Sequence, residues 1–249
     1  MRPVGRGRIR VLAAAALVAL VPSLLAACDP PPDRLPDLGM DRLIDISLNQ
    51  TADGHRLLRF TTIIVNVGQG AFELHGSRPA GAQTMSVSQR VYDTDGGHRD
   101  VSTTASMYYS GDGHNHWHVR DLESYELVRL DNRRTVGTGA KHGFCFSDNV
   151  PFRLSLPFAP QSPVYRSCGV AQDTAVVMGL SVGWGDRYGA TLPDQYIDVT
   201  GLATGRYRLT ATADAAGWFT ESDNTNNATW VDLRIGPHDV TIDAYGPSA

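Results

Sequence analysis

Short runs in which hydrophobic and polar residues alternate dominate the chain and predict β-strands. Residues 55–76 alternate in this way, are rich in β-branched side chains and are interrupted at residues 68–70, Gly-Gln-Gly. This pattern predicts two strands with a tight connection between them. Residues 125–130 and 195–217 repeat the pattern, the second with a turn at an Ala-Thr-Gly sequence. Residues 218–235 predict two further strands around a polar loop rich in Asp and Asn.

The pattern of hydrophobic and polar residues also predicts the fold class. No segment after residue 28 has the periodicity of a long amphipathic helix. Residues 77–110 have the weakest pattern, and we expect strands and long loops there. Many short strands separated by Gly, Pro, Asn and Asp favour an all-β fold, an antiparallel β-sandwich. We expect this sandwich to be one domain spanning residues 38–249, a length sufficient for a single core.

The first residues have the pattern of a targeting segment and are excluded from the fold. Four arginines, at positions 2, 6, 8 and 10, precede an apolar stretch that ends in Leu-Ala-Ala-Cys at residues 25–28. This ending resembles a bacterial lipobox, which predicts a lipoprotein signal peptide over residues 1–27 and a lipidated Cys28. An ordinary signal peptide cut near Ala27, or an uncleaved anchor, would fit the same residues. The proline-rich residues 28–37 predict an extended tether.

These segments bear on localisation and on partners. The signal peptide holds 4 of the 22 basic residues and no acidic residue, so 18 basic and 26 acidic residues remain and the net charge is −8. An acidic domain of this kind argues against nucleic acid as a partner. The sequence therefore predicts an exported cell-surface lipoprotein that contacts the membrane only through its lipid anchor.

Two cysteines remain once Cys28 is assigned to the lipid. Cys145 and Cys168 lie 23 residues apart in a chain expected to be exported. In that compartment a pair of cysteines favours a disulfide over the alternative of two free thiols.

A run of alternate histidines is the first candidate for chemistry. His114, His116 and His118 occupy every second position of a segment that has the composition of a strand. In a strand such residues project from one face, about 7 Å apart, within reach of a common ion. Three nitrogen ligands that leave an open position suit copper or zinc, and the spacing does not separate these two metals. The alternative is a polar, histidine-rich strand edge without a metal.

Lys141 is the second candidate, because it is the only lysine in a chain with 21 arginines. Arginine supplies the same charge, but its guanidinium is not deprotonated in proteins. Only the lysine amine can become neutral and form a bond to carbon. A chance survivor of an arginine-rich composition is the alternative.

Five segments resemble the lysyl oxidase family, in the same order along the chain. Residues 114–127, HNHWHVRDLESYEL, resemble its copper-binding segment, and residues 139–145, GAKHGFC, resemble the segment of its cofactor lysine. Residues 185–209 resemble the segment of its cofactor tyrosine, and residues 57–74 and 220–227 resemble the beginning and end of its catalytic domain. Together these motifs extend over about 180 residues. The resemblance implies a bacterial lysyl oxidase-like lipoprotein with a sandwich of that type.

The resemblance also implies roles for single residues. His114, His116 and His118 match the copper ligands. Lys141 and Tyr188 match the lysine and the tyrosine that the family joins into lysine tyrosylquinone, a cofactor made from the chain itself. Asp186, two residues before Tyr188, is a candidate for the base that removes the α-proton of the substrate or for an orienting partner. A solvated loop carboxylate is the alternative for Asp186.

The implied function is a copper- and quinone-dependent amine oxidase. It converts a primary amine, either a small amine or a peptidyl lysine, to an aldehyde, uses molecular oxygen, and releases hydrogen peroxide and ammonia. The chain departs from the animal members in having fewer cysteines, Gly113 in place of the cysteine before the triplet, and no further upstream histidine. Two other functions remain open: a non-enzymatic copper- or zinc-binding surface lipoprotein, and a three-histidine zinc hydrolase. Neither of them gives Lys141 a role.

Overall fold

The computed structural model of the protein describes residues 29–111, 115–139 and 143–249. All regular secondary structure in these ranges is β-strand, and every strand pair is antiparallel. The all-β prediction is therefore confirmed. No helix in the described ranges is long and apolar enough to cross a membrane.

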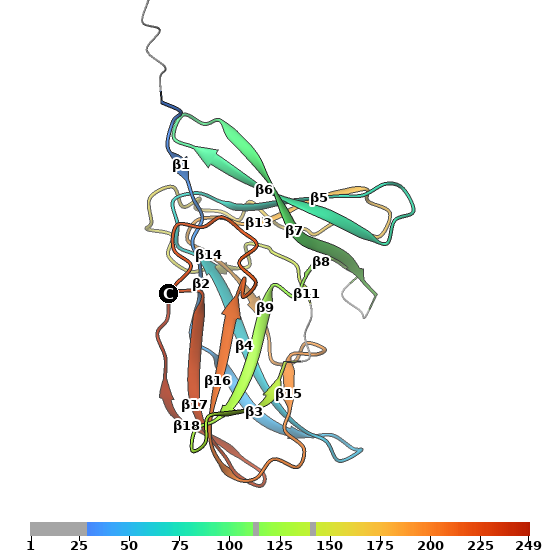
Figure 1. Ribbon diagram of the computed structural model, residues 1–249, viewed down its shortest axis with the longest axis vertical. Coiled ribbons are helices and arrows are strands. Elements are labelled where there is room, and N and C mark those ends of the chain that lie inside the picture. Colours follow the sequence, from blue (N-terminus) through green and yellow to red (C-terminus); the bar gives the residue numbers. More distant parts are fainter. Residues whose placement is uncertain (1–28, 112–114, 140–142) are drawn as a thin grey trace, which may run out of the picture. The chain divides into compact units, whose positions relative to one another are not determined.

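The strands form three sheets (Figure 1). The first sheet contains seven strands: β11 (Gly143–Phe144), β8 (His116–Arg120), β7 (His98–Ser110), β6 (Thr84–Asp93), β5 (Phe72–Ser77) and β13 (Ala175–Leu180) in that order, with β1 (Asp33–Arg34) beside β6. The second contains five: β10 (Arg134–Thr138), β9 (Glu123–Arg129), β16 (Gly205–Ala213), β17 (Ala228–Ile235) and β18 (Val240–Tyr245). The third contains β12 (Val150–Pro151), β14 (Trp184–Tyr188), β4 (Arg56–Asn66) and β15 (Tyr196–Asp198), with β2 (Leu38–Met40) and β3 (Ile44–Gln50) also on β4.

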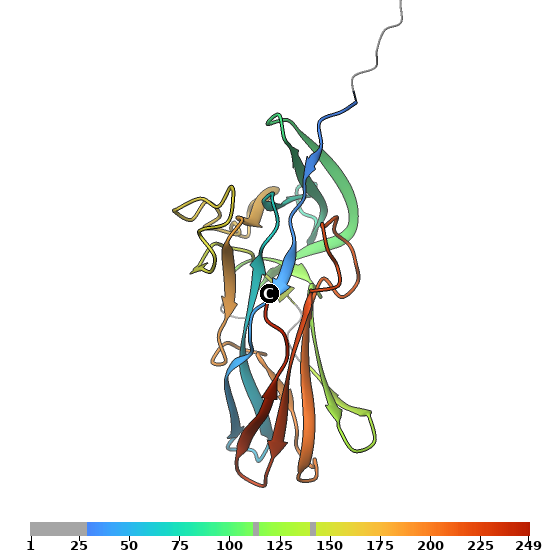
Figure 2. The same ribbon diagram turned by 90° about the vertical axis from the view of Figure 1, so that its left-hand side faces the viewer.

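The second and third sheets pack face to face, as a sandwich requires. In both views the pair β16–β17 lies alongside β4 (Figures 1 and 2). Phe60 of β4 meets Tyr125 of β9 edge-on, with ring centroids 4.9 Å apart. Along β9 and β16 buried and exposed positions alternate, so one face of each strand supplies the core. Leu127, Tyr207 and Leu209 are buried in this layer.

Residues 55–76 do form two strands, β4 and β5, joined by a short connection. The two strands belong to different sheets and do not pair with each other. Residues 77–110, where the pattern was weakest, contain the long strands β6 and β7, which pair over most of their length. A buried position of β6 is taken by Gln89, whose amide exchanges two hydrogen bonds with the backbone of Thr220. Hydrophobic periodicity carries no signal for such a position, because the residue is polar.

The compact unit begins at Pro31, seven residues before the expected domain start at residue 38. Asp33 and Arg34 pair with β6, and the carbonyl of Leu35 accepts hydrogen bonds from the amides of Gln69 and Gly70. The second half of the expected tether is thus bonded to the domain.

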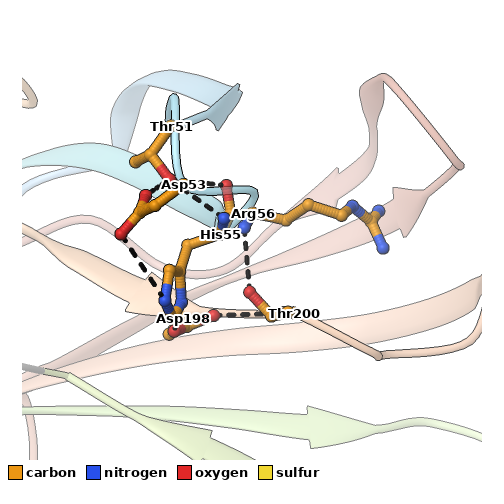
Figure 3. Close-up of polar contacts among 6 residues, drawn as sticks. All are labelled: Thr51, Asp53, His55, Arg56, Asp198 and Thr200. Carbon is orange, nitrogen blue, oxygen red and sulfur yellow. Dashed lines mark hydrogen bonds and ion pairs between the residues drawn. The ribbon is translucent and has the colours of Figure 1, made fainter.

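A polar cluster joins the end of β15 to the start of β4 (Figure 3). His55 Nδ1 lies 2.8 Å from Asp198 Oδ2, and its Nε2 lies 3.8 Å from Asp53 Oδ2. The hydrogen bond with Asp198 is the main reason why the pKa of His55 is raised. Thr200 accepts from the amide of Arg56 and donates its own amide to Asp198. These side chains are solvent-exposed, so the cluster fastens two strand ends and contributes little stability.

Candidate active site

Strand β8 presents two of the three predicted histidines side by side. The ring centroids of His116 and His118 are 4.6 Å apart, while Trp117 between them is buried on the opposite face. The strand is bracketed by Asn115 and Asp121, whose φ angles of 46° and 50° suit the left-handed region that Asn and Asp tolerate best. The period-2 arrangement is therefore confirmed for His116 and His118.

The chemistry of this pair fits a metal ion. His118 is buried and His116 is half-buried, and their rings are neighbours on one face of β8. Within residues 29–111, 115–139 and 143–249 no group of three His, Cys, Asp or Glu side chains is close enough to hold a metal. The third predicted ligand, His114, lies outside the described residues. The three-histidine site stays a prediction that the observed pair supports.

Tyr188 is buried at the end of β14, in contact with the strand that follows the predicted cofactor lysine. Its hydroxyl donates to the carbonyl of Cys145 at 2.7 Å and accepts from the amide of Cys145 at 2.5 Å. Its ring packs on Phe144 of β11, with centroids 4.6 Å apart. Burial, and after it the charge of Asp186, raises the pKa of the Tyr188 phenol well above its usual range. The phenol therefore stays neutral at physiological pH.

Lys141 itself lies outside the described residues, but the chain on both sides of it is fastened near the site. On one side the amide of Gly139 donates to the carbonyl of Tyr125 on β9. On the other side β11 pairs with Val119 and Arg120, next to His118 on β8. The two anchor points are thus on β8, the strand that carries the histidines, and on β9.

Gly143 is the residue at which β11 passes closest to the histidine strand. A Cβ atom there would lie 2.9 Å from the Cβ of His118 and would collide with the hydroxyl of Tyr108. Tyr108 is the register partner of His118 on β7, and its ring lies 5.8 Å from the imidazole. Only glycine permits this approach, and the sequence reading did not identify either Gly143 or Tyr108 as part of the site.

We expect Gly143→Ala to lower the free energy of unfolding by about 1–3 kcal/mol, the usual cost of overpacking. Gly189→Ala is the matched control, because no atom lies within 4 Å of a Cβ placed there. Both substitutions restrict the unfolded backbone to the same extent. The difference between their free energies of unfolding therefore measures the cost of the collision at residue 143. Urea unfolding of the two copper-free variants measures it, and equal midpoints would contradict the close approach.

The predicted disulfide between Cys145 and Cys168 is confirmed. Cys145 holds the Tyr188 hydroxyl, and the carbonyl of Cys168 accepts from the backbone amide of Trp117, between the two histidines. One covalent bond therefore connects the clamp on the tyrosine with the histidine strand.

Asp186 shares the buried face of β14 with Tyr188, as their spacing predicted, and is not a solvated loop carboxylate. One carboxyl oxygen, Oδ1, accepts a hydrogen bond from the side-chain amide of Asn149. Burial raises the pKa of Asp186 well above its usual range. Burial therefore favours the protonated form of Asp186 over the carboxylate.

Two site residues that sequence reasoning missed, Glu123 and Tyr125, lie on β9. Both are buried, and the Tyr125 hydroxyl donates to Glu123 Oε2 at 2.9 Å. The signal was present in the pattern, since Glu123, Tyr125 and Leu127 alternate on the buried face of one strand. A charged residue at a core position of a strand is an expected mark of a functional site.

The described residues thus define an all-β domain in which a histidine strand, a clamped buried tyrosine and two buried acids lie within one disulfide-linked region. The lysyl oxidase family model matches residues 83–244, which is more than half of the chain. The chain belongs to the lysyl oxidase family.

The relatives that the chain resembles include proteins named protein-lysine 6-oxidase. The human protein is 33% identical over 127 residues, which are 50% of this chain and 27% of the human chain. The chicken protein is 32% identical over 126 residues, which are 50% of this chain and 27% of the chicken chain. Lysyl oxidase homolog 1 of Homo sapiens is 31% identical over 115 residues, 46% of this chain and 18% of its own. The chain therefore spans about a quarter or less of the length of these relatives.

Proposed function

We propose that the protein is a copper-dependent amine oxidase with a quinone built from Lys141 and Tyr188. The net reaction consumes a primary amine, oxygen and water and yields an aldehyde, ammonia and hydrogen peroxide. The observation that carries the proposal is the clamp on Tyr188. Its oxygen is held by the backbone of Cys145, four residues after Lys141, while β11 between them pairs with the strand of His116 and His118.

The residues of the chain have separate tasks in this proposal. His116 and His118, together with His114, would hold copper. Copper would supply the oxidation of Tyr188 by oxygen, and the quinone would supply a reactive carbonyl and an electron sink. Cys145 fixes the position of the Tyr188 oxygen, and the ring of Phe144 excludes water from one side of it. Preorganised contacts of this kind lower the cost of reaching the reactive geometry.

Asp186 is the proposed group for proton transfer at the α-carbon of the amine. It is next to Tyr188 on the same face, and Asn149 orients its carboxyl group. A carboxyl whose pKa is raised by burial is suited to exchange protons near neutral pH.

Peptide mapping tests the proposal. Copper-loaded wild-type protein, digested under oxygen, should yield one fused peptide that contains both Lys141 and Tyr188. Full copper occupancy with two separate, unmodified peptides would favour the non-enzymatic metal-binding lipoprotein instead. Hydrolysis with zinc bound and no quinone would favour the hydrolase.

We also propose that Cys28 is lipidated after removal of residues 1–27 and that the protein is held at the cell surface. The lipobox-like residues 25–28 support this. Cys28→Ser should release the protein from the membrane fraction into the medium, as measured by immunoblotting. Wild-type protein found in the medium with an unmodified Cys28 would be inconsistent with the anchor.

A further inference from the structure

The loop between β12 and β13 differs in composition from the rest of the domain. Residues 152–172 contain no strand, and Figure 1 shows them in yellow beside β1. They include two arginines and no aspartate or glutamate, although the chain after residue 27 holds 26 acidic and 18 basic residues. Three of the seven large hydrophobic residues that are exposed in the described ranges belong to this loop, namely Phe158, Val164 and Val170. Apolar side chains and positive charge are therefore concentrated in one surface loop.

The loop holds its exposed side chains in fixed positions. Phe158 and Val164 form one patch, because both line the same hollow of about 350 Å³. The indole of Trp184 donates to the carbonyl of Pro160 at 2.8 Å. The backbone amide of Val164 donates to Asp148 Oδ2, also at 2.8 Å. The patch is thus a preformed surface and not a loose segment.

Stability alone does not explain Phe158. Its φ angle is 68°, in the left-handed region, where a bulky residue is strained and glycine or asparagine is better tolerated. Its ring is exposed, so it adds little to the core. A strained backbone that presents an exposed aromatic ring is better explained by a contact of the ring with something outside the folded chain.

The patch lies beside the chain that leads to the proposed lipid anchor. Arg34 of β1 lies over the ring of Phe158, with its guanidinium carbon 4.1 Å from the ring centroid. Arg34 follows Cys28 by six residues, and a fully extended chain spans at most about 21 Å over that length. A lipid on Cys28 would therefore keep Arg34 and the ring of Phe158 near the surface of the bilayer.

We propose that residues 152–172 dock on the lipid bilayer, with Phe158 and Val164 inserted at the level of the headgroups and the arginines facing anionic phosphates. The inference rests on the proposed lipidation of Cys28, which brings the loop to the membrane. Exposed apolar patches mark surfaces of this kind, and arginines next to them are attracted to anionic lipids. The lipid holds the protein at the membrane, and the loop fixes the orientation of the domain.

This orientation bears on the candidate active site. Strand β14 begins at Trp184, which holds the loop, and ends at Tyr188, about 13 Å further along the strand. Docking of the loop therefore sets the distance and the direction of the Tyr188 site from the bilayer.

Quenching by brominated lipids tests the docking. Phe158→Trp places a fluorescent reporter in the patch, and the indole still offers Arg34 an aromatic face. The lipidated full chain is reconstituted in vesicles of phosphatidylcholine and phosphatidylglycerol, with brominated or with ordinary phosphatidylcholine. The emission that the substitution adds to the wild-type signal should be at least about twofold lower with the brominated lipid, because side chains of interfacial segments insert about 5–10 Å.

Ile242→Trp is the matched control. Ile242 is 42% exposed, against 57% for Phe158, and lies on β18, at the opposite end of the domain from β1 (Figures 1 and 2). The emission that it adds should be the same in both kinds of vesicle. Equal quenching of the two reporters would indicate contact with lipid in all orientations and overturn the proposal.

Phe158→Asn separates docking from folding. Asparagine tolerates the left-handed region, so the urea midpoint should not fall. The affinity of the unlipidated Cys28→Ser chain for the same vesicles, which is weak in keeping with its expected release from cells, should drop about tenfold when Phe158→Asn is added. A lower urea midpoint with unchanged vesicle binding would mean that Phe158 serves the fold, and the docking would be wrong.

The anchor and the docking fail in different ways. If Cys28 carries no lipid but the Cys28→Ser chain binds vesicles through Phe158, the anchor is wrong and the docking is supported. If Cys28 is lipidated but the emission of Phe158→Trp is not quenched, the anchor is supported and the docking is refuted. A shift of this emission that grows with protein concentration in the absence of vesicles would assign the patch to a second copy of the chain and overturn the lipid surface.

Discussion

Lys141→Arg is expected to fold and to bind copper but to release no peroxide from amines above the background of the copper-free protein. Arginine preserves the charge and matches every other basic position of the chain. It cannot provide a neutral amine that bonds to carbon, so the fused peptide with Tyr188 should be absent. Its free energy of unfolding should change by no more than about 1 kcal/mol, because the exchange removes no charge. Peroxide release, copper content and peptide mapping measure the three expectations.

The control exchanges the same two residue types elsewhere. Arg134→Lys, at an exposed position of β10, should retain full peroxide release and the fused peptide. Amine oxidation that survives in Lys141→Arg would rule out a lysine-linked cofactor, even if copper remained essential.

Asp186→Asn is expected to lower amine oxidation by about 10²–10⁴-fold, the usual contribution of a positioned acid or base. The fold should at the same time become more stable. Burial raises the pKa of Asp186 in the folded state above its unfolded value, so wild-type stability is highest below the unfolded pKa and falls as pH rises toward the folded pKa. Asparagine avoids this loss and keeps an acceptor for Asn149, so the variant should be more stable than the wild type at neutral pH, and the gain should vanish in acid.

Urea unfolding of the copper-free variant at acidic and neutral pH measures this gain. Asp194→Asn is the control, because that carboxyl group is exposed and its replacement should shift neither activity nor the pH profile. A variant that is less stable than wild type at neutral pH, or that oxidises amines at the wild-type rate, would remove Asp186 from the proposed proton transfer. The expected trade of stability for activity is common at active sites.

The positions of many strands were predictable, because alternation of hydrophobic and polar residues depends only on neighbouring residues. Alternation over residues 55–76 and 195–217 predicted strands that the structure contains, since side chains on successive residues of a strand point to opposite faces. The assignment of β4 and β5 to different sheets was not predictable, because a short connection is compatible with a hairpin or with a change of sheet. For residues 77–110 the sequence predicted strands but not their limits or pairing, because polar residues such as Gln89 occupy part of the buried face of β6.

Some residues of the candidate site were predicted by their spacing along one strand, and others were brought to the site only by the tertiary structure. The spacing of His116 and His118 put both rings on one face, and Asp186 and Tyr188 share a face for the same reason. His114 and Lys141, outside the described residues, remain predictions. Glu123 was visible only as an acid in a strand, and no local pattern indicated that it would be held by Thr62, 61 residues earlier.

The sequence by itself determined the strand pattern, the adjacent imidazoles, the single lysine and the pair of cysteines, because each depends on residue type and on spacings of a few residues. Only the tertiary structure decided that the Tyr188 hydroxyl is held by the backbone of Cys145, 43 residues away, and that the disulfide connects this clamp to the strand of His118. It also decided that Asp186 and Glu123 are buried beside the same phenol. These contacts arise where separate sheets pack, and burial, which sets the protonation of an acid, is a property of that packing and not of local sequence.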